Sequence, residues 1–287
     1  MLCEAENNLR DCSAEKNFRN IKLILSYDGT DFSGWQRQEK RQKGGPLKGG
    51  PLKGGALNGG AFKGEPRTVQ GVIEDALEKI HKGPVTLTGA GRTDARVHAS
   101  AQAANFYTPI KSMDAGRFVP ALNSLLPRDV RVLDAREVRP DFHARFDARL
   151  RTYRYFFITR QNAFPWELRY AWHLRRQPDI AKLNEFARLL RGEMDCTAFA
   201  VPGDKSRSRF RYIAGASFFI DGDRLVFEIS ANAFLWKMVR SVAGTLVRWE
   251  EKGLSAAYLS EVIESKSRTL TGPTAPPEGL FLWRVDF

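Results

Sequence analysis

The residues best placed to do chemistry lie in the stretch GAGRTDARVHAS, at positions 89–100, where one carboxylate stands between two arginines. The guanidinium groups of Arg92 and Arg96 favour the ionised form of the Asp94 carboxylate. An ionised aspartate suits nucleophilic attack and is a poor proton donor. Taken alone, the stretch is explained better as a loop salt bridge, so the reactive interpretation needs support from other residues.

Other chemistry-bearing residues lack the spacing of a metal or cofactor site. The cysteines are odd in number and scattered, and no two histidines have ligand spacing: Cys3, Cys12, Cys196, His81, His98, His143 and His173. The GAG run has no GxGxxG or GK[ST] pattern around it. We therefore expect no metal and no cofactor.

The charge of the chain favours a polyanionic partner. Its 287 residues carry a formal net charge of +12, and excess Lys and Arg attract phosphate backbones. No apolar run approaches the roughly 18 residues that cross a membrane. The N-terminal residues are polar and mixed in charge, without the pattern of a signal or transit peptide. We expect a cytoplasmic protein that binds nucleic acid and no membrane.

The elements that would position Asp94 follow a regular order in the first half of the chain. Periodicity predicts strands at 21–29, 84–89, 101–108 and 130–138, and helices at 69–80, after a capping Thr68, and at 114–126 despite Pro120. The order is β-α-β-β-α-β. Gly89 and Gly91 then permit a tight backbone path in a loop that follows a strand.

The second half repeats this order without obvious sequence repetition. It predicts strands at 148–160, 211–220, 224–230 and 280–287, with helices around 180–190, 234–251 and 255–266. Asp221 and Gly222 form the turn of a hairpin. The class is therefore α+β, with two ferredoxin-like, split βαβ halves whose mostly antiparallel sheets carry helices on one face. We expect the other face to form a central basic cleft or a joint between the halves.

This order suggests three domain-level parts and one insertion. We expect a flexible extension at 1–19, an N-terminal half at 20–138 and a C-terminal half at 139–287. Within the first half, residues 39–66 include Gly-Gly pentads at 44–64. A period of five is too short for a solenoid unit, so we predict a low-complexity loop.

Several separated blocks resemble, in order, those of the TruA-type tRNA pseudouridine synthases. The blocks are YDGTDFSGWQRQ, RTVQ, GAGRTDARVHA, ALNSLLPRDV, DFHARFDARLRTYRYFF, ANAFLWKMVRSVAGTL and GPTAPPEGLFLWRV. The resemblance covers most of the chain and implies a homodimer that isomerises uridine to pseudouridine at positions 38, 39 and 40 of the tRNA anticodon arm.

The resemblance also implies a role for four residues. Asp94 would be the nucleophile and Arg240 the cation paired with it. Arg92 would help displace the target base, and Tyr153 would stack on it. These roles are physically reasonable, because a stacked uridine must be flipped out before a side chain can reach it. A guanidinium can take the place of the base, and an aromatic face can hold it.

Each assignment has a structural alternative. Tyr153 and Tyr155 share a strand face, where sheet packing is the default role. Arg240 lies on an apolar helix, where a buried guanidinium needs a carboxylate partner. Asn123, His143 and Arg145 also fall in family-like blocks, but capping and backbone bonding explain them, so we do not predict catalytic roles. The basic clusters at 148–155 and 204–212 are candidates for lining the cleft.

Two departures from the family pattern keep a second function open. The insertion at 39–66 stands where the family has a short loop, and Arg96 stands where the family has glycine. If that glycine has a positive φ, arginine at this position costs about 1 kcal/mol or more. The alternative is a basic protein that binds structured RNA without catalysis. Asp94, Tyr153 and Arg240 together argue against it, because a pure binder has no need of a carboxylate aimed at RNA.

Overall fold

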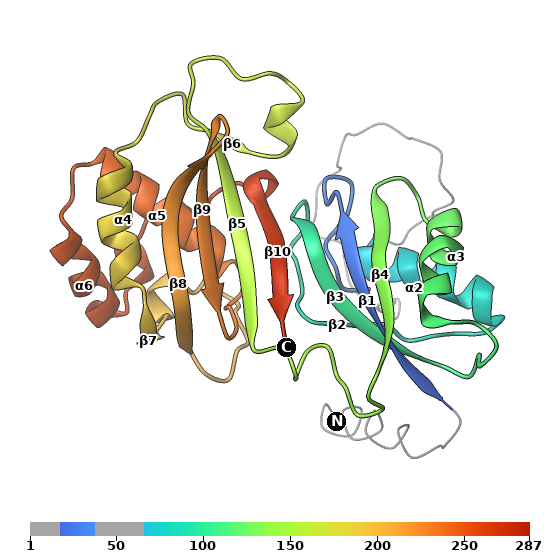
Figure 1. Ribbon diagram of the computed structural model, residues 1–287. Helices are drawn as coiled ribbons and strands as arrows, with labels where there is room; N and C mark the ends of the chain where they lie inside the picture. The colour runs from blue at the N-terminus through green and yellow to red at the C-terminus, as the bar shows by residue number, and fades with distance from the viewer. Residues whose placement is uncertain (1–17, 38–65) are drawn as a thin grey trace, which may run out of the picture.

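The computed structural model describes residues 18–37 and 66–287, and one open sheet runs through them (Figure 1). In this part of the chain the sheet has ten strands, mostly antiparallel, and it is accompanied by five α-helices. The α+β class predicted from the sequence is confirmed. The predicted Gly-Gly loop at 44–64 lies outside the described residues, as do residues 1–17 of the predicted extension.

The first part of the sheet has the strand order β4-β1-β3, with β2 beside β3. Its elements are β1 (Arg19–Tyr27), α2 (Val69–His81), β2 (Thr88–Gly89), β3 (His98–Thr108), α3 (Phe118–Leu125) and β4 (Val130–Val138). The predicted cap is confirmed, because the Thr68 side chain accepts a hydrogen bond from the Gly71 N–H. The strand predicted at 84–89 is wrong in length. The Leu87 backbone bonds instead to the Gln70 and Glu74 side chains of α2.

The second part has the order β10-β5-β9-β8-β7. Its elements are β5 (Leu150–Ile158), β6 (Trp172–His173), α4 (Ile180–Leu189), β7 (Gly192–Asp195), β8 (Phe210–Asp221), β9 (Arg224–Ala231), α5 (Met238–Glu251), α6 (Ala256–Ser265) and β10 (Leu280–Asp286). The sequence analysis missed the short strands β6 and β7. Without them, each part has four strands, and their order across the sheet is the same: the fourth in the chain, then the first, the third and the second. This shared order supports two ferredoxin-like halves, which remain a prediction together with their boundaries.

Helix α5 begins later than the sequence predicted. Residues 234–237 are not helical, because Lys237 adopts a left-handed backbone with φ of 58°. A hydrogen bond from the Met238 N–H to the Leu235 carbonyl closes a turn just before the helix. The turn leaves the Trp236 side chain 46% exposed instead of enclosing it in a helix face.

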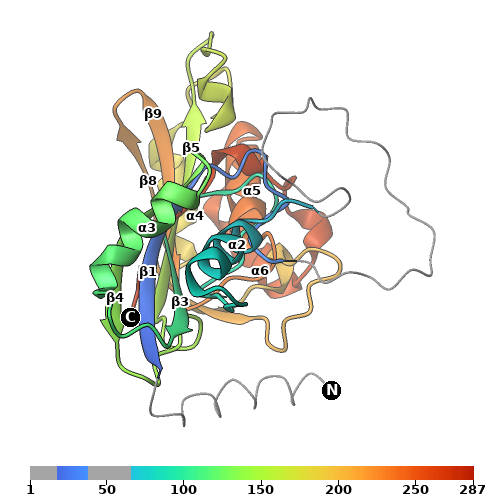
Figure 2. The ribbon, with the colours of Figure 1, turned by 90° about the vertical axis from the view of Figure 1, so that its right-hand side faces the viewer.

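The two parts of the sheet meet edge to edge at β10. This strand pairs in parallel with β3, with Phe281 opposite His98 and Leu282 opposite Ala99, and antiparallel with β5. Helices α2, α5 and α6 lie on the same side of the sheet (Figure 2). The expectation that the open face forms the joint is therefore wrong, because strand edges supply it.

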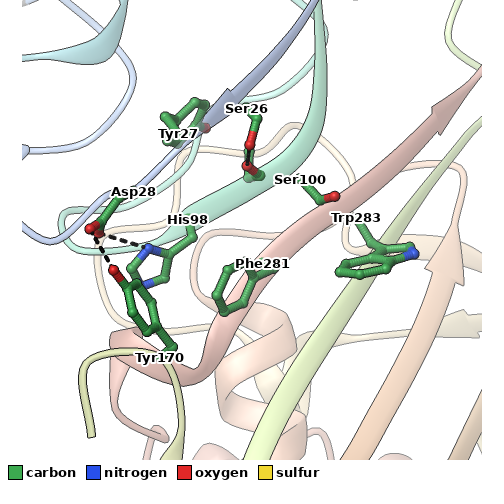
Figure 3. A pocket seen from close by; sticks show the side chains of 9 residues that line it. Ser26, Tyr27, Asp28, His98, Ser100, Tyr170, Phe281 and Trp283 are labelled. Carbon is green, nitrogen blue, oxygen red and sulfur yellow. Dashed lines mark hydrogen bonds and ion pairs between the residues drawn. The ribbon is translucent and has the colours of Figure 1, made fainter. Parts of the chain in front are cut away.

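A polar junction reinforces this joint around Asp28. The Tyr170 hydroxyl donates to Oδ2 of Asp28 (2.9 Å), Arg169 lies 2.9 Å from the same oxygen, and His98 Nδ1 lies 3.2 Å from Oδ1. Figure 3 shows Asp28, His98 and Tyr170 converging at one end of a hollow of about 250 Å³, whose lining extends to Trp283. Burial raises the pKa of the Asp28 carboxyl, but the hydrogen bonds outweigh burial, and the net shift is downward.

Replacing Asp28 by asparagine should lower the free energy of unfolding at pH 7 by about 1 to 3 kcal/mol, because charge-assisted hydrogen bonds are lost. A carboxyl whose pKa is lowered by folding stabilises above its unfolded pKa of about 3.9, and this contribution is lost as the pH falls through the folded value. The difference between wild type and Asp28→Asn should therefore narrow in urea titrations below about pH 3.9. Asp31→Asn, at an exposed partner of Arg169, is the control and should change little. Equal stability of wild type and Asp28→Asn at pH 7 would contradict the prediction.

Candidate active site

The loop that carries Asp94 is held by a neighbouring segment of the same half, residues 32–35. The Trp35 N–H donates to the Thr93 carbonyl (3.0 Å), and the Arg96 N–H donates to the Phe32 carbonyl (3.2 Å). These bonds fix the loop backbone on both sides of the aspartate. The position of Asp94 is therefore set by residues about 60 positions earlier in the chain.

Two glycines make this close packing possible. Gly34 has φ of +107°, and a Cβ there would lie 2.8 Å from the Thr93 carbonyl oxygen. A Cβ on Gly89 would lie 2.5 Å from the Trp35 ring. Gly91 has neither a positive φ nor a close neighbour, since its Cβ would meet only the Tyr153 hydroxyl at 3.9 Å. The tight backbone path predicted at Gly89 and Gly91 is therefore a packing requirement at Gly89 alone.

Both carboxylate oxygens of Asp94 have partners from the other half. Arg240, in the first turn of α5, places Nη1 3.3 Å from Oδ2, and the Trp236 indole N–H donates to Oδ1 (2.8 Å). The side chains of Asp94 and Arg240 are 20% and 12% exposed. The Arg240 Nε–H donates to the Ala275 carbonyl (2.8 Å). Asp94 is thus the carboxylate partner that the buried guanidinium of Arg240 requires.

The contact of Trp236 with Asp94 was missed by sequence reasoning. The predicted helix over 234–251 placed this residue on a helix face, whereas it lies in the turn before α5. Its backbone N–H is held by the Asp204 carboxylate (2.6 Å), and Lys237 Nζ lies 4.4 Å from its ring centre. A large amphipathic side chain four residues before Arg240 was the available signal.

Tyr153 lies beside Asp94 but is mostly enclosed. It is 8% exposed, and its ring meets Phe234 edge to face at 5.1 Å. Burial raises the pKa of its hydroxyl, and the Asp94 charge raises it further, so the phenol is neutral. Tyr155 is fully buried and donates to the Pro276 carbonyl. Its role is therefore packing, whereas base stacking by Tyr153 stays a prediction.

A cluster of arginines lies near the Asp94 loop. Arg92 is an exposed residue, but partial desolvation still lowers the pKa of its guanidinium, and the positive charge of Arg145 adds to this effect. Arg151 donates to backbone carbonyls on both halves, including those of Ala90 (2.9 Å) and Asn232 (2.7 Å). Among the described residues, no carboxylate forms an ion pair with Arg92, Arg145 or Arg151. Neighbouring guanidinium groups without carboxylates favour an anionic ligand.

Other polar residues that the sequence singled out make local contacts. Asn123 exchanges two hydrogen bonds with the Val132 backbone, and Nδ1 of His143 accepts the N–H groups of Arg145 and Phe146. In the basic clusters, Arg154 pairs with Glu228 and Arg209 with Asp204. The proposed lining of a cleft by residues 148–155 and 204–212 stays a prediction.

Tyr153, beside Asp94, lies on the helix-covered side of the sheet. Tyr153 belongs to the apolar cluster that includes Met238 and Val242 of α5, whereas Phe156 and Trp283 pack together on the opposite face. The central basic cleft predicted on the open face stays a prediction. No group of three or more His, Cys, Asp or Glu side chains in 18–37 and 66–287 could hold a metal ion. None of the helices described is long and apolar enough to span a membrane.

Comparison with known proteins gives one family. The family model described as tRNA pseudouridine synthase matches residues 59–147 and 186–287, more than half of the chain. The chain is 53% identical to the tRNA pseudouridine synthase A of Treponema denticola, over 95% of this chain and 94% of that protein. The protein of the same name from Treponema pallidum is 47% identical over 89% and 84% of the two chains. The one from Brachyspira hyodysenteriae is 38% identical over 93% and 98%.

Replacing Gly34 by alanine should disturb the Asp94 loop. A Cβ at this position meets the Thr93 carbonyl and also strains a backbone with positive φ, so we expect about 2 kcal/mol or more of lost stability. Thermal denaturation measures this loss. Gly116→Ala is the matched control, since a Cβ there meets nothing within 4 Å. Equal melting temperatures for the two variants would contradict the packing argument.

Proposed function

Because the chain belongs to the tRNA pseudouridine synthase family, whose members isomerise uridine in tRNA, we propose that Asp94 is the nucleophile of this reaction. The observation that carries the proposal is the contact of Asp94 with Arg240 at 3.3 Å, in a site that leaves the carboxylate 20% exposed. The contact fixes the direction of a carboxylate that stays partly open to a substrate, as nucleophilic attack requires.

The isomerisation needs a group that holds one fragment while the other turns. The N1–C1′ glycosidic bond breaks, the uracil rotates, and C5 bonds to C1′; C5 then loses its proton and N1 gains one, so substrate and product have the same composition. No electrons are gained or lost. A carboxylate can serve by bonding to the sugar C1′ or to the uracil ring, and a glycal is a third possible intermediate. The geometry of Asp94 is compatible with each.

Arg240 and Trp236 orient the carboxylate for this step. Each oxygen of Asp94 receives one N–H donor from the second half, which leaves lone pairs for the substrate. The arginine is itself fixed by the Ala275 carbonyl. Both donors lie on one continuous segment, the start of α5 and the hydrogen-bonded turn before it, which fixes their directions relative to each other.

Arg92 and Tyr153 would handle the flipped base. Arg92 is exposed, faces Arg145 and has no carboxylate partner among the described residues, which suits insertion into an RNA stem beside phosphates. Tyr153 borders Asp94 with a neutral ring, so a uracil placed beside the carboxylate would contact it. Tyr153 is only 8% exposed, so Phe234 or the loop must move and uncover part of the Tyr153 ring before a base can stack on it.

We further propose that the target uridines are those at positions 38, 39 and 40 of the anticodon stem-loop. The chain would act on them as a cytoplasmic homodimer. The resemblance of the sequence blocks supports these points, and the net charge of +12 supports binding to an RNA stem.

Asp94→Ala and Asp94→Asn should lower tritium release from tRNA labelled at uridine C5 by more than about a thousandfold, because no other carboxylate replaces the nucleophile. Both variants should still bind tRNA, since they remove no positive charge. Release at the wild-type rate by either variant would remove Asp94 from the mechanism. Binding without release by the wild-type protein would favour the alternative, an RNA-binding protein without catalysis.

Trp236→Phe should lower the single-turnover rate by about 10- to 100-fold, because one hydrogen bond to a charged group is lost while the ring remains. Trp236→His retains an N–H donor and should be less impaired. Tritium release and tRNA binding, measured together, separate loss of orientation from loss of affinity. If the phenylalanine variant keeps the full rate, the indole N–H has no role in orienting Asp94.

A further inference from the structure

Arg96 occupies a backbone conformation that favours glycine. Its φ is +65°, in the turn closed by the hydrogen bond from the Val97 N–H to the Asp94 carbonyl. Arginine is disfavoured in this left-handed region. The related family pattern has glycine at this position. This chain therefore has the left-handed backbone that suits glycine, although an arginine side chain disfavours that conformation. Something outside the turn must hold the conformation.

The side chain of Arg96 supplies such a contact. Its Nη2 lies 2.7 Å from Oε1 of Glu278, in the short 3₁₀ helix Pro277–Gly279 that leads into β10. Arg96 is 53% exposed, but the Glu278 side chain is only 16% exposed. The pair therefore links the Asp94 loop to a mostly enclosed segment near the C-terminus of the chain.

The segment around Glu278 also holds Arg240. The Ala275 carbonyl accepts from Arg240 Nε (2.8 Å), and the Ala275 N–H donates to the Arg240 carbonyl (3.0 Å). The Pro276 carbonyl accepts from the Tyr155 hydroxyl (2.7 Å). The guanidinium that pairs with Asp94 is thus placed by the same segment that Arg96 binds.

Two ion pairs of opposite polarity therefore join the Asp94 loop to Arg240 and its support. Asp94 offers a negative charge to Arg240, and Arg96 offers a positive charge to Glu278. Glu278 follows three residues after Ala275, whose carbonyl accepts from Arg240, so one short segment supports both pairs. Without Arg96, the Glu278 carboxylate would lose the ion-pair partner that the described residues give it.

We propose that Arg96 is a positioning residue for the isomerisation: by binding Glu278, it keeps the Asp94 loop in register with Arg240. The inference rests on the proposed role of Asp94. It differs from an RNA contact by Arg96, which would act through tRNA affinity and would not require Glu278.

The test compares Arg96→Ala with Glu278→Gln in the full-length protein, measuring single-turnover tritium release and tRNA binding. Each variant removes one charge of the ion pair, and each should lower the rate by about tenfold or more, since small misplacements of reacting groups are costly. The dissociation constant for tRNA should change less than about twofold. The double variant should be no slower than the slower single variant, because both remove one interaction.

Two further variants separate the side chain from the backbone. Arg96→Lys keeps a cation that can reach Glu278 and should recover most of the rate. Arg96→Gly relieves the backbone but loses the pair, so it should stay slow. Arg248→Ala is the control: it removes a cation from an exposed pair with Glu251, two turns along α5 from Arg240, and should keep the wild-type rate. Melting temperatures check that every variant is folded.

Several results would overturn the proposal. A full rate in Glu278→Gln, together with weaker and less salt-dependent tRNA binding in Arg96→Ala, would make Arg96 a phosphate contact. Wild-type rates in Arg96→Ala or Arg96→Gly would also refute it. Asp94→Ala in the same assay distinguishes a failure of the role of Arg96 from a failure of the proposed nucleophile. If that variant is inactive while the Arg96 variants are normal, only this inference fails; if it is active, the proposed nucleophile fails.

Discussion

The site depends on one interaction, the contact between the Asp94 carboxylate and the Arg240 guanidinium across the joint between the two parts of the sheet. Neither group can be left alone, because a buried unpaired charge is costly. The fold must therefore fix the separation between the Asp94 loop and the start of α5, which belong to different halves, to within a few tenths of an ångström. Strand β10 meets this demand, since it pairs with β3 beside the Asp94 loop and with β5 beside Tyr153. The segment before β10 reaches back to Arg240.

The same constraint explains why so much of the surrounding structure is polar but enclosed. Arg151 donates to carbonyls from both halves. Asp28 contacts Arg169, Tyr170 and His98 near the start of β3. Hydrogen-bonded charges fix position more narrowly than apolar contacts do, because their geometry is directional. They also restrict how the halves can shift. The contact between Asp94 and Arg240 needs that restriction.

Much of this arrangement could be predicted from local sequence signals. Thr68 marks the start of α2, alternation marks β4 from Val130 to Val138, and Asp221-Gly222 marks the hairpin of β8 and β9. The demand of Arg240 for a carboxylate could also be stated in advance. The failures share a cause, since tertiary contacts override periodicity. Leu87 bonds to α2 instead of a strand, and the left-handed Lys237 turns Trp236 out of a predicted helix toward Asp94. The edge joint through β10 is likewise a non-local pairing.

Arg96 shows why a departure from a family pattern has no meaning until its partner is known. From the sequence, an arginine in place of a glycine predicts strain and an added charge. In the structure, a specific contact compensates for the strain and another compensates for the added charge. The Arg96 N–H is held by the Phe32 carbonyl, and its charge is matched by Glu278. The first bond fixes the backbone from the N-terminal half, and the second fixes the side chain from the segment that supports Arg240. A residue tied to both halves in this way constrains the distance between Asp94 and Arg240, whereas glycine, with no side chain, can constrain only the turn.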